Sequence, residues 1–103
     1  MGKFTNVNEL VNTLKPDYPV YCIRPNSVRK SVEFFKNNFP GKVLYAVKTN
    51  PNEKIIKIII NSGIQNFDVA SIDEVKLIKK NITPRRFILI FLDYYVIRLV
   101  FEC

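Results

Sequence analysis

Apolar and polar residues follow two rhythms along the chain, and these predict a series of strands and helices. Three short runs rich in apolar residues are typical of buried strands, at residues 19–23, 42–48 and 65–70. Longer segments carry apolar residues three and four positions apart, which is the spacing of one helix face. These segments predict helices at residues 6–15, 25–39, 50–63 and 71–81.

Capping residues predict where several helices begin and end. A residue that can cap a helix start is followed three positions later by glutamate, as in a capping box. The pairs are Asn6 with Glu9, Asn50 with Glu53, and Ser71 with Glu74. Gly63 is a suitable residue to follow the end of the third helix. In the second helix the predicted apolar stripe consists of Val28, Val32, Phe35 and Phe39.

Strands that alternate with helices of this length predict right-handed parallel βαβ units, and therefore an α/β fold. The order is one helix, three βα units and a further apolar stretch from Phe87. A TIM-type barrel needs eight such units, so this order predicts only part of one. We divide the chain into a helical lead-in (1–18), a partial barrel domain (19–86) and a divergent hydrophobic tail (87–103).

The tail is nearly all large apolar residues from Phe87 to Phe101, interrupted by Asp93 and Arg98. A membrane-spanning helix needs about 20 predominantly apolar residues, so the tail is too short and is charged twice. One buried strand accounts for its first half. We therefore expect no membrane partner, and a membrane-surface anchor is the weaker alternative.

The formal charge of +7 raises the question of nucleic-acid binding. The basic residues are scattered, however, and cluster only in pairs such as Lys79–Lys80 and Arg85–Arg86. The sequence has no zinc-finger spacing, no basic recognition helix and no aromatic RNA-binding signature. We expect no nucleic-acid partner.

Histidine is absent from the sequence, which excludes Ser-His and Cys-His nucleophilic systems and argues against a metal site. Cys22 and Cys103 are too few and too far apart to predict a disulfide framework. Cys22 is interpreted as a small core residue of the first predicted strand. The N-terminus carries no apolar signal segment, so we expect a cytoplasmic protein.

Lys48 stands at the end of an otherwise apolar predicted strand. Side chains alternate in a strand, so Leu44, Ala46 and Lys48 are expected on one face. In βα folds of the barrel type, catalytic groups gather at the carboxyl ends of strands. A partly desolvated amine there becomes a nucleophile that can form a Schiff base. The alternative is a solvated lysine with no role.

Two linked motifs decide between these interpretations. The string "YAVKTNPN" at 45–52 is followed, after one predicted helix, by "FDVASIDEV" at 67–75. Together they resemble the pyridoxal-phosphate-binding barrel domain of the ornithine, diaminopimelate and arginine decarboxylase family, and the string from Pro19 to Asn52 is most similar to bacterial ornithine-type members. Alanine racemases share the fold and the lysine, but continue into a loop unlike Thr49-Asn50-Pro51.

The resemblance implies roles for four residues. Lys48 would hold pyridoxal 5′-phosphate as the Schiff-base lysine, and Ala46 would line the floor of the site. Asp68 and Glu74 match acidic positions near the cofactor. Each of the last three also has a structural interpretation: packing for Ala46, a polar strand end for Asp68 and helix capping for Glu74.

The implied function is the N-terminal piece of a pyridoxal-phosphate-dependent amino-acid decarboxylase of ornithine type, in polyamine biosynthesis. The family's phosphate cradle, ring-nitrogen partner and stacking histidine have no counterparts here. We therefore expect catalysis only with a separately encoded remainder or a homodimer partner. The alternative is a non-catalytic truncated remnant or interaction module. The change at Phe87 fits a frameshift or premature stop in the gene.

Overall fold

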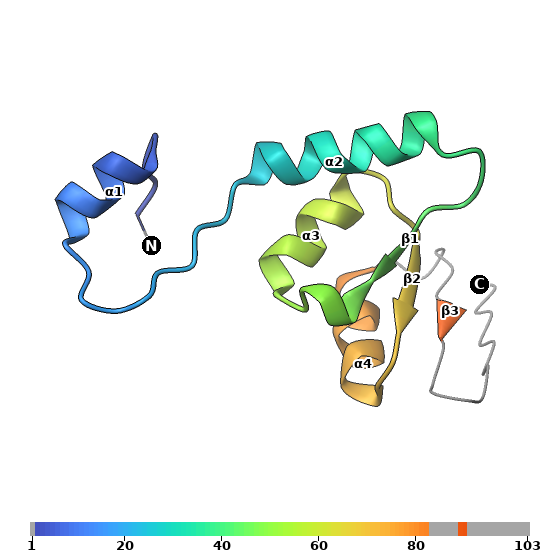
Figure 1. Ribbon diagram of the computed structural model, residues 1–103. Helices are drawn as coiled ribbons and strands as arrows, with labels where there is room; N and C mark the ends of the chain where they lie inside the picture. The colour runs from blue at the N-terminus through green and yellow to red at the C-terminus, as the bar shows by residue number, and fades with distance from the viewer. Residues whose placement is uncertain (1, 83–88, 91–103) are drawn as a thin grey trace.

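The computed structural model describes residues 2–82 and 89–90 of the 103-residue chain. Figure 1 shows a small sheet with helices packed beside it, and a first helix that stands apart at the end of an extended segment. The elements are, in chain order, α1 (Val7–Leu14), α2 (Pro25–Asn38), β1 (Leu44–Ala46), the 3₁₀ helix η1 (Val47–Thr49), α3 (Glu53–Asn61), β2 (Asn66–Val69), α4 (Ile72–Asn81) and β3 (Leu89–Ile90).

The sheet is parallel, with the strand order β1-β2-β3. Leu44 pairs with Asn66 and Ala46 with Asp68, while Asp68 pairs on its other side with Leu89. Each new strand is added beside the last after one helix, which confirms the predicted α/β fold built from parallel βαβ units.

The core lies on one face of this sheet. Phe67 and Val69 of β2 are fully buried, together with Ile56 of α3 and Ile78 of α4. Helix α3 packs against both α2 and α4, so the helices form one layer. Its mostly isoleucine sequence forms a helix because Asn52 and Ser62 cap its two ends. The alternation of a strand then leaves Asn66 and Asp68 on the opposite, partly exposed face.

The predicted strand at 19–23 is wrong for this structure, which places these residues in an extended segment without strand pairing. Tyr21 is 70% exposed and Cys22 is exposed, so the predicted core position of Cys22 is also wrong. An apolar run becomes a strand only where a neighbouring strand accepts its backbone hydrogen bonds. The sequence pattern could not supply that neighbour.

The predicted caps of α1 and α4 are confirmed. The side-chain oxygen of Asn6 accepts the backbone N–H of Glu9 at 2.8 Å, and that of Ser71 accepts the N–H of Glu74 at 3.2 Å. The two glutamates do not return to the cap residue itself. Each accepts from the N–H one position earlier, at Thr5 and at Ala70. Both helices therefore begin with the same variant of the capping box.

Helix α3 begins two residues later than predicted. Its cap is Asn52, whose side-chain oxygen accepts the N–H of Lys54 at 2.9 Å. Asn50 instead ends η1, where its N–H donates to the carbonyl of Val47, and its side-chain oxygen accepts the N–H of Asn52 at 3.2 Å. At the other end, Gly63 has φ +103°, which confirms the predicted glycine position after the helix.

The apolar stripe of α2 is only partly covered. Val32 is buried, but Phe35 and Phe39 are each 54% exposed. Phe39 follows the last residue of the helix rather than continuing its face. The sheet ends at β1 beneath α2, so no described strand supports the outer part of the stripe.

The predicted apolar strand after Phe87 is described only at Leu89–Ile90, as β3. The rest of the tail from residue 91 lies outside the described residues. No helix in the described part of the chain is long and apolar enough to span a membrane.

Candidate functional site

The carboxyl ends of the parallel strands lie at one edge of the sheet, and the predicted site residues gather there. β1 ends at Ala46 and β2 at Val69. Because neighbouring parallel strands run the same way, the segments that follow them leave the sheet at this edge. Lys48 lies in η1, which follows β1 directly, and Glu74 lies in the first turn of the helix that follows β2.

Lys48 is not the last residue of a strand, as the sequence predicted, but the middle residue of η1. The chain turns out of the sheet because Thr49 Oγ1 donates to the carbonyl of Ala46 at 2.7 Å, and the N–H of Asn50 donates to the carbonyl of Val47 at 3.2 Å. Val47 is fully buried in the core. The turn therefore anchors itself through Val47 and leaves Lys48 exposed at the sheet edge.

The amine of Lys48 is accessible. Its side chain is exposed, and no carboxylate in the described part of the chain forms an ion pair with it. The described residues do not bury this amine, although partial desolvation was expected for a nucleophilic lysine. They supply its position and its access instead.

Asn50 ties the turn to two tyrosines. Its backbone carbonyl accepts the hydroxyl of Tyr45 at 3.0 Å, and its side-chain amide donates to the Tyr21 oxygen at 2.9 Å. Sequence reasoning missed this network. The sequence Asn50-Pro51 carried the signal for it. Asparagine followed by proline marks a turn, in which the amide groups can form hydrogen bonds with other side chains.

Ala46 and Asp68, both predicted as site residues, lie side by side in the sheet. They are paired residues of β1 and β2, and paired residues of parallel strands share one sheet face. Both are partly buried on the face opposite the core.

Glu74 is held at the same edge by its capping role. Its carboxylate accepts the backbone N–H of Ala70 at 2.8 Å, directly after β2. This contact is the structural interpretation that the sequence already offered for Glu74. One carboxylate oxygen is engaged there, and the side chain is only partly buried.

The pKa values of two other carboxyl groups at helix starts are lowered by hydrogen bonds. A hydrogen bond from Lys80 lowers the pKa of Glu53, and a contact with Asn81 and the charge of Lys57 add to the effect, while burial opposes it. The pKa of Glu9 is lowered by hydrogen bonds from Thr5. Neither group was predicted as a site residue: Glu9 belongs to the start of α1, and Glu53 links α3 to Lys80 of α4.

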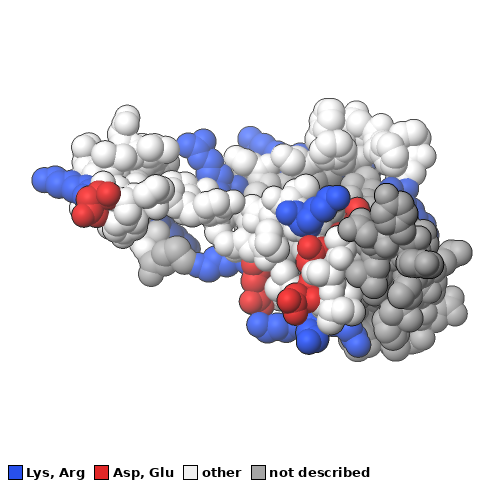
Figure 2. Space-filling view, turned by 60° about the horizontal axis from the view of Figure 1, so that its bottom comes forward, with Lys and Arg blue, Asp and Glu red and all other residues white. Residues whose placement is uncertain are grey.

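Basic side chains do not form one continuous patch on the face that Figure 2 presents. Lysine and arginine side chains are spread over several elements there, with carboxylates between them. In the described structure, Lys80 forms an ion pair with Glu53 at 3.1 Å. A surface that binds a nucleic-acid backbone concentrates positive charge along one stripe, and this face lacks such a stripe.

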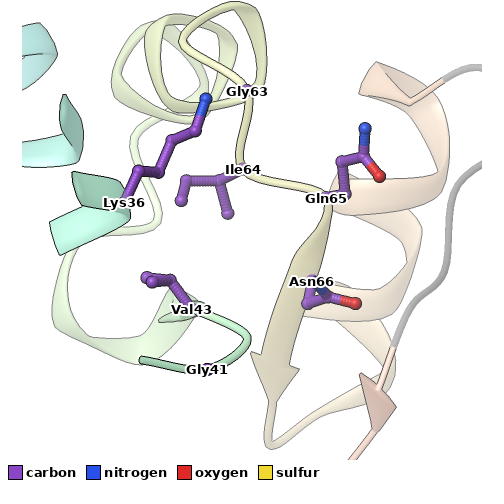
Figure 3. A pocket seen from close by; sticks show the side chains of 7 residues that line it. All are labelled: Lys36, Gly41, Val43, Gly63, Ile64, Gln65 and Asn66. Carbon is purple, nitrogen blue, oxygen red and sulfur yellow. The ribbon is translucent and has the colours of Figure 1, made fainter. Parts of the chain in front are cut away.

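Two hollows lie in the described structure. The smaller, of about 230 Å³, lies at the amino ends of β1 and β2. Figure 3 shows Lys36 extending toward the turn at Gly63 there, with Val43 and Ile64 beside it. The amine of Lys36 donates to the carbonyl of Ser62 at 3.3 Å, so it closes the end of α3. This is a structural contact.

The larger hollow, of about 380 Å³, lies between α2, β1 and α3 and is mainly apolar. None of Lys48, Asp68 and Glu74 lines either hollow. Among the described residues, no group of three acidic, cysteine or histidine side chains could hold a metal ion.

The fold and the site together define an α/β protein that presents a lysine amine at the carboxyl edge of a parallel sheet. A family model described as "Pyridoxal-dependent decarboxylase, pyridoxal binding domain" matches residues 25–92. This match covers more than half of the chain, so the chain belongs to that family. Comparisons with curated proteins and with solved structures gave no match.

Proposed function

We propose that this chain provides the cofactor lysine of a pyridoxal-phosphate-dependent amino-acid decarboxylase of ornithine type. The observation that carries the proposal is the exposed amine of Lys48, which stands at the carboxyl edge beside the pair of Ala46 and Asp68. Family membership supports the cofactor class. The ornithine preference rests on the resemblance of residues 19–52.

The residues present fit the aldehyde end of the cofactor. Lys48 is a primary amine with an open approach, and Thr49 and Asn50 fix the backbone that carries it. Ala46 would leave room for a flat ring, because its side chain is the smallest that still maintains the strand. Asp68 and Glu74 would face the cofactor from the next strand and helix.

Pyridoxal phosphate supplies an electron sink that stabilises the carbanion left when carbon dioxide departs. The protein must anchor the aldehyde, keep the ring in place and fix the substrate. Lys48 would hold the aldehyde end of the cofactor through Nζ, the primary amine at this edge of the sheet. The described residues supply no cluster of hydrogen-bond donors that would bind the phosphate. Holding the pyridine ring and the substrate would therefore need a separately encoded remainder or a homodimer partner.

The alternative is that the chain is a non-catalytic remnant or interaction module of the same family. The partly exposed face of the sheet, with Leu44 37% exposed, favours contact with further protein. A protein partner could bind this surface under either proposal. The two proposals are therefore distinguished by whether Lys48 reacts with pyridoxal phosphate.

The test is to incubate the purified chain with pyridoxal phosphate, reduce with borohydride and map the modified lysines by mass spectrometry. We expect modification concentrated at Lys48. Lys48→Arg keeps the charge and removes the reactive amine, so it should abolish the dominant site. The matched control is Lys76→Arg, which changes an exposed lysine of α4 and should leave the modification at Lys48 unchanged.

The substrate is tested by release of carbon dioxide from ornithine, lysine, arginine and diaminopimelate, with the chain alone and with the product of the downstream DNA. Turnover of ornithine that is lost in Lys48→Arg supports the ornithine-type enzyme. Turnover of another amino acid overturns only the substrate. Modification spread evenly over exposed lysines, without turnover, overturns the proposed role of Lys48 and supports the remnant.

A further inference from the structure

Three hydrogen bonds of different reach close η1, the turn that carries the candidate lysine. Two of them are local. The Thr49 hydroxyl donates to the carbonyl of Ala46, and the N–H of Asn50 donates to the carbonyl of Val47. In the third, the Tyr45 hydroxyl donates to the backbone carbonyl of Asn50 at 3.0 Å. This third bond joins β1 to the backbone that follows η1, so it spans the whole turn.

Tyr45 reaches the turn from the face of the sheet that the helices cover. It pairs in register with Phe67, which is fully buried, and it packs against the core. By strand alternation its neighbours Leu44 and Ala46 lie on the opposite face. Because the ring of Tyr45 is partly buried, packing restricts where its hydroxyl can lie. The core, and not the turn itself, therefore sets the position of this donor.

The side-chain contacts of the turn differ in their exposure to solvent. The bond from Thr49 is exposed, and so is the contact between the Tyr21 oxygen and the side-chain amide of Asn50. The bond from Tyr45 is partly buried. Water competes less for a partly buried donor and acceptor, so such a bond restrains its partners more strongly. Among these contacts we expect the bond from Tyr45 to restrain the backbone most.

We propose that Tyr45 is a positioning residue for Lys48. Its hydroxyl holds the carbonyl of Asn50 after the lysine, while β1 holds the residues before the turn. The backbone that carries Lys48 is thus fixed on both sides, and its exposed amine stays at the carboxyl edge of the sheet. Tyr45 acts through this backbone and needs no contact with the cofactor or the substrate. The inference rests on the proposed function of Lys48.

A purely structural role for the Tyr45 hydroxyl makes a different prediction. If the hydroxyl only satisfied a backbone carbonyl, its removal would lower the stability of the fold but affect all lysines alike. A positioning role predicts a change that is specific to Lys48 in the folded chain. Lys76, an exposed residue of α4, provides the internal reference. The ratio of modification at Lys48 to that at Lys76 therefore separates the two roles.

The test compares Tyr45→Phe with the unmodified full chain. Phenylalanine keeps the ring that packs against the core and removes only the donor. Each protein is incubated with pyridoxal phosphate, reduced with borohydride and mapped by mass spectrometry, at a temperature where circular dichroism shows it folded. We expect the ratio of Lys48 to Lys76 modification to fall about two- to tenfold, as for the loss of one hydrogen bond. The matched control, Tyr18→Phe, removes an exposed hydroxyl and should leave the ratio unchanged.

Hydrogen exchange measures the turn without the cofactor. The N–H of Asn50 closes η1, and that of Ile56 donates to the carbonyl of Asn52 at the start of α3. In Tyr45→Phe, exchange at Asn50 should become at least about twofold faster relative to exchange at Ile56. Equal acceleration at both amides would indicate a general loss of stability and would overturn the positioning role. Unchanged exchange at Asn50 would overturn it as well.

The outcomes separate this inference from the function on which it rests. If Lys48 is modified preferentially in the unmodified chain and equally so in Tyr45→Phe, the role of Tyr45 is wrong and the proposed function stands. If modification is already spread evenly over the exposed lysines of the unmodified chain, the proposed function is wrong. Hydrogen exchange at Asn50 then decides by itself whether Tyr45 holds the turn.

Discussion

The two faces of the sheet differ in burial. The buried face stabilises the fold, and the partly exposed face carries candidate site residues. Along β2, Phe67 and Val69 are fully buried against the helices, whereas Asn66 and Asp68 are partly exposed on the other side. The same alternation in β1 buries Val47 beyond the strand end and leaves Leu44 37% exposed. Burial holds the fold on one face, and the candidate site residues Ala46 and Asp68 lie on the other.

The largest effect is expected from Phe67→Ala, which removes the central side chain of the covered face. Truncation of a fully buried phenylalanine costs about 3–5 kcal/mol, through lost burial and the cavity left behind. Asp68→Asn, its neighbour on the open face, should cost about 0.5 kcal/mol or less. Urea unfolding measures both. Similar losses for the two variants would break the distinction between the faces.

Ser71→Ala tests how the segment after β2 is held at the site edge. Loss of the cap hydrogen bond to Glu74 should lower stability by about 1 kcal/mol and loosen the first turn of α4. The matched control is Ser31→Ala in α2, where the hydroxyl only donates back to the carbonyl of Ser27. That change should be neutral or slightly stabilising. If both variants lose equal stability, Ser71 is not acting as a cap.

Thr49→Val tests the corresponding segment after β1. The substitution keeps the shape of the side chain and removes the hydroxyl that closes η1 on the carbonyl of Ala46. We expect a loss of about 0.5–1.5 kcal/mol in the free energy of unfolding. The borohydride modification at Lys48 should fall as well, because the amine is no longer held at the edge. Thr13→Val, at an exposed position of α1, should change neither measurement.

The smallest effect concerns Glu53, on the solvent side of the helix layer. Its pKa is lowered in the folded state, chiefly by the hydrogen bond from Lys80, so its ionised form favours folding. This stabilisation is present above its ordinary pKa of 4.5 and is lost as the pH falls through the lowered folded value.

The corresponding variant is Glu53→Gln. The difference in unfolding midpoint between it and the unmodified chain should be small at pH 7 and should shrink as the pH falls below 4.5. High salt should reduce it at pH 7, because both partners are exposed to solvent. A difference that persists at low pH would show that packing, and not charge, is responsible.

The sequence predicted those features that depend on local interactions. The caps at Asn6 and Ser71, the glycine after α3 and the alternation of strands with helices all follow from residues within a few positions of each other. The position of Lys48 at a carboxyl edge is also local, since it needs only the end of one strand. Its neighbours Ala46 and Asp68 could be named because two motifs at a fixed separation resemble one family.

The features that the sequence did not predict depend on competition or on distant partners. Asn50 and Asn52 are both able to cap a helix, and in the structure Asn50 ends η1 while Asn52 begins α3. The end of β1 is set by the hydroxyl of Thr49, which an apolar pattern does not register. The segment 19–23 has the composition of a strand, but its pairing depends on an edge elsewhere in the fold.

The register of the sheet has a consequence for how the chain folds. Leu44 pairs with Asn66, and Asp68 with Leu89, so each strand pairing joins residues just over twenty positions apart. Parallel sheets that join distant segments fold slowly, because a long loop must close, with a loss of entropy, before its contacts add stability. Here the closure from β1 to β2 spans only η1 and α3. The unit of β1, α3 and β2 can therefore form during synthesis, before β3 leaves the ribosome.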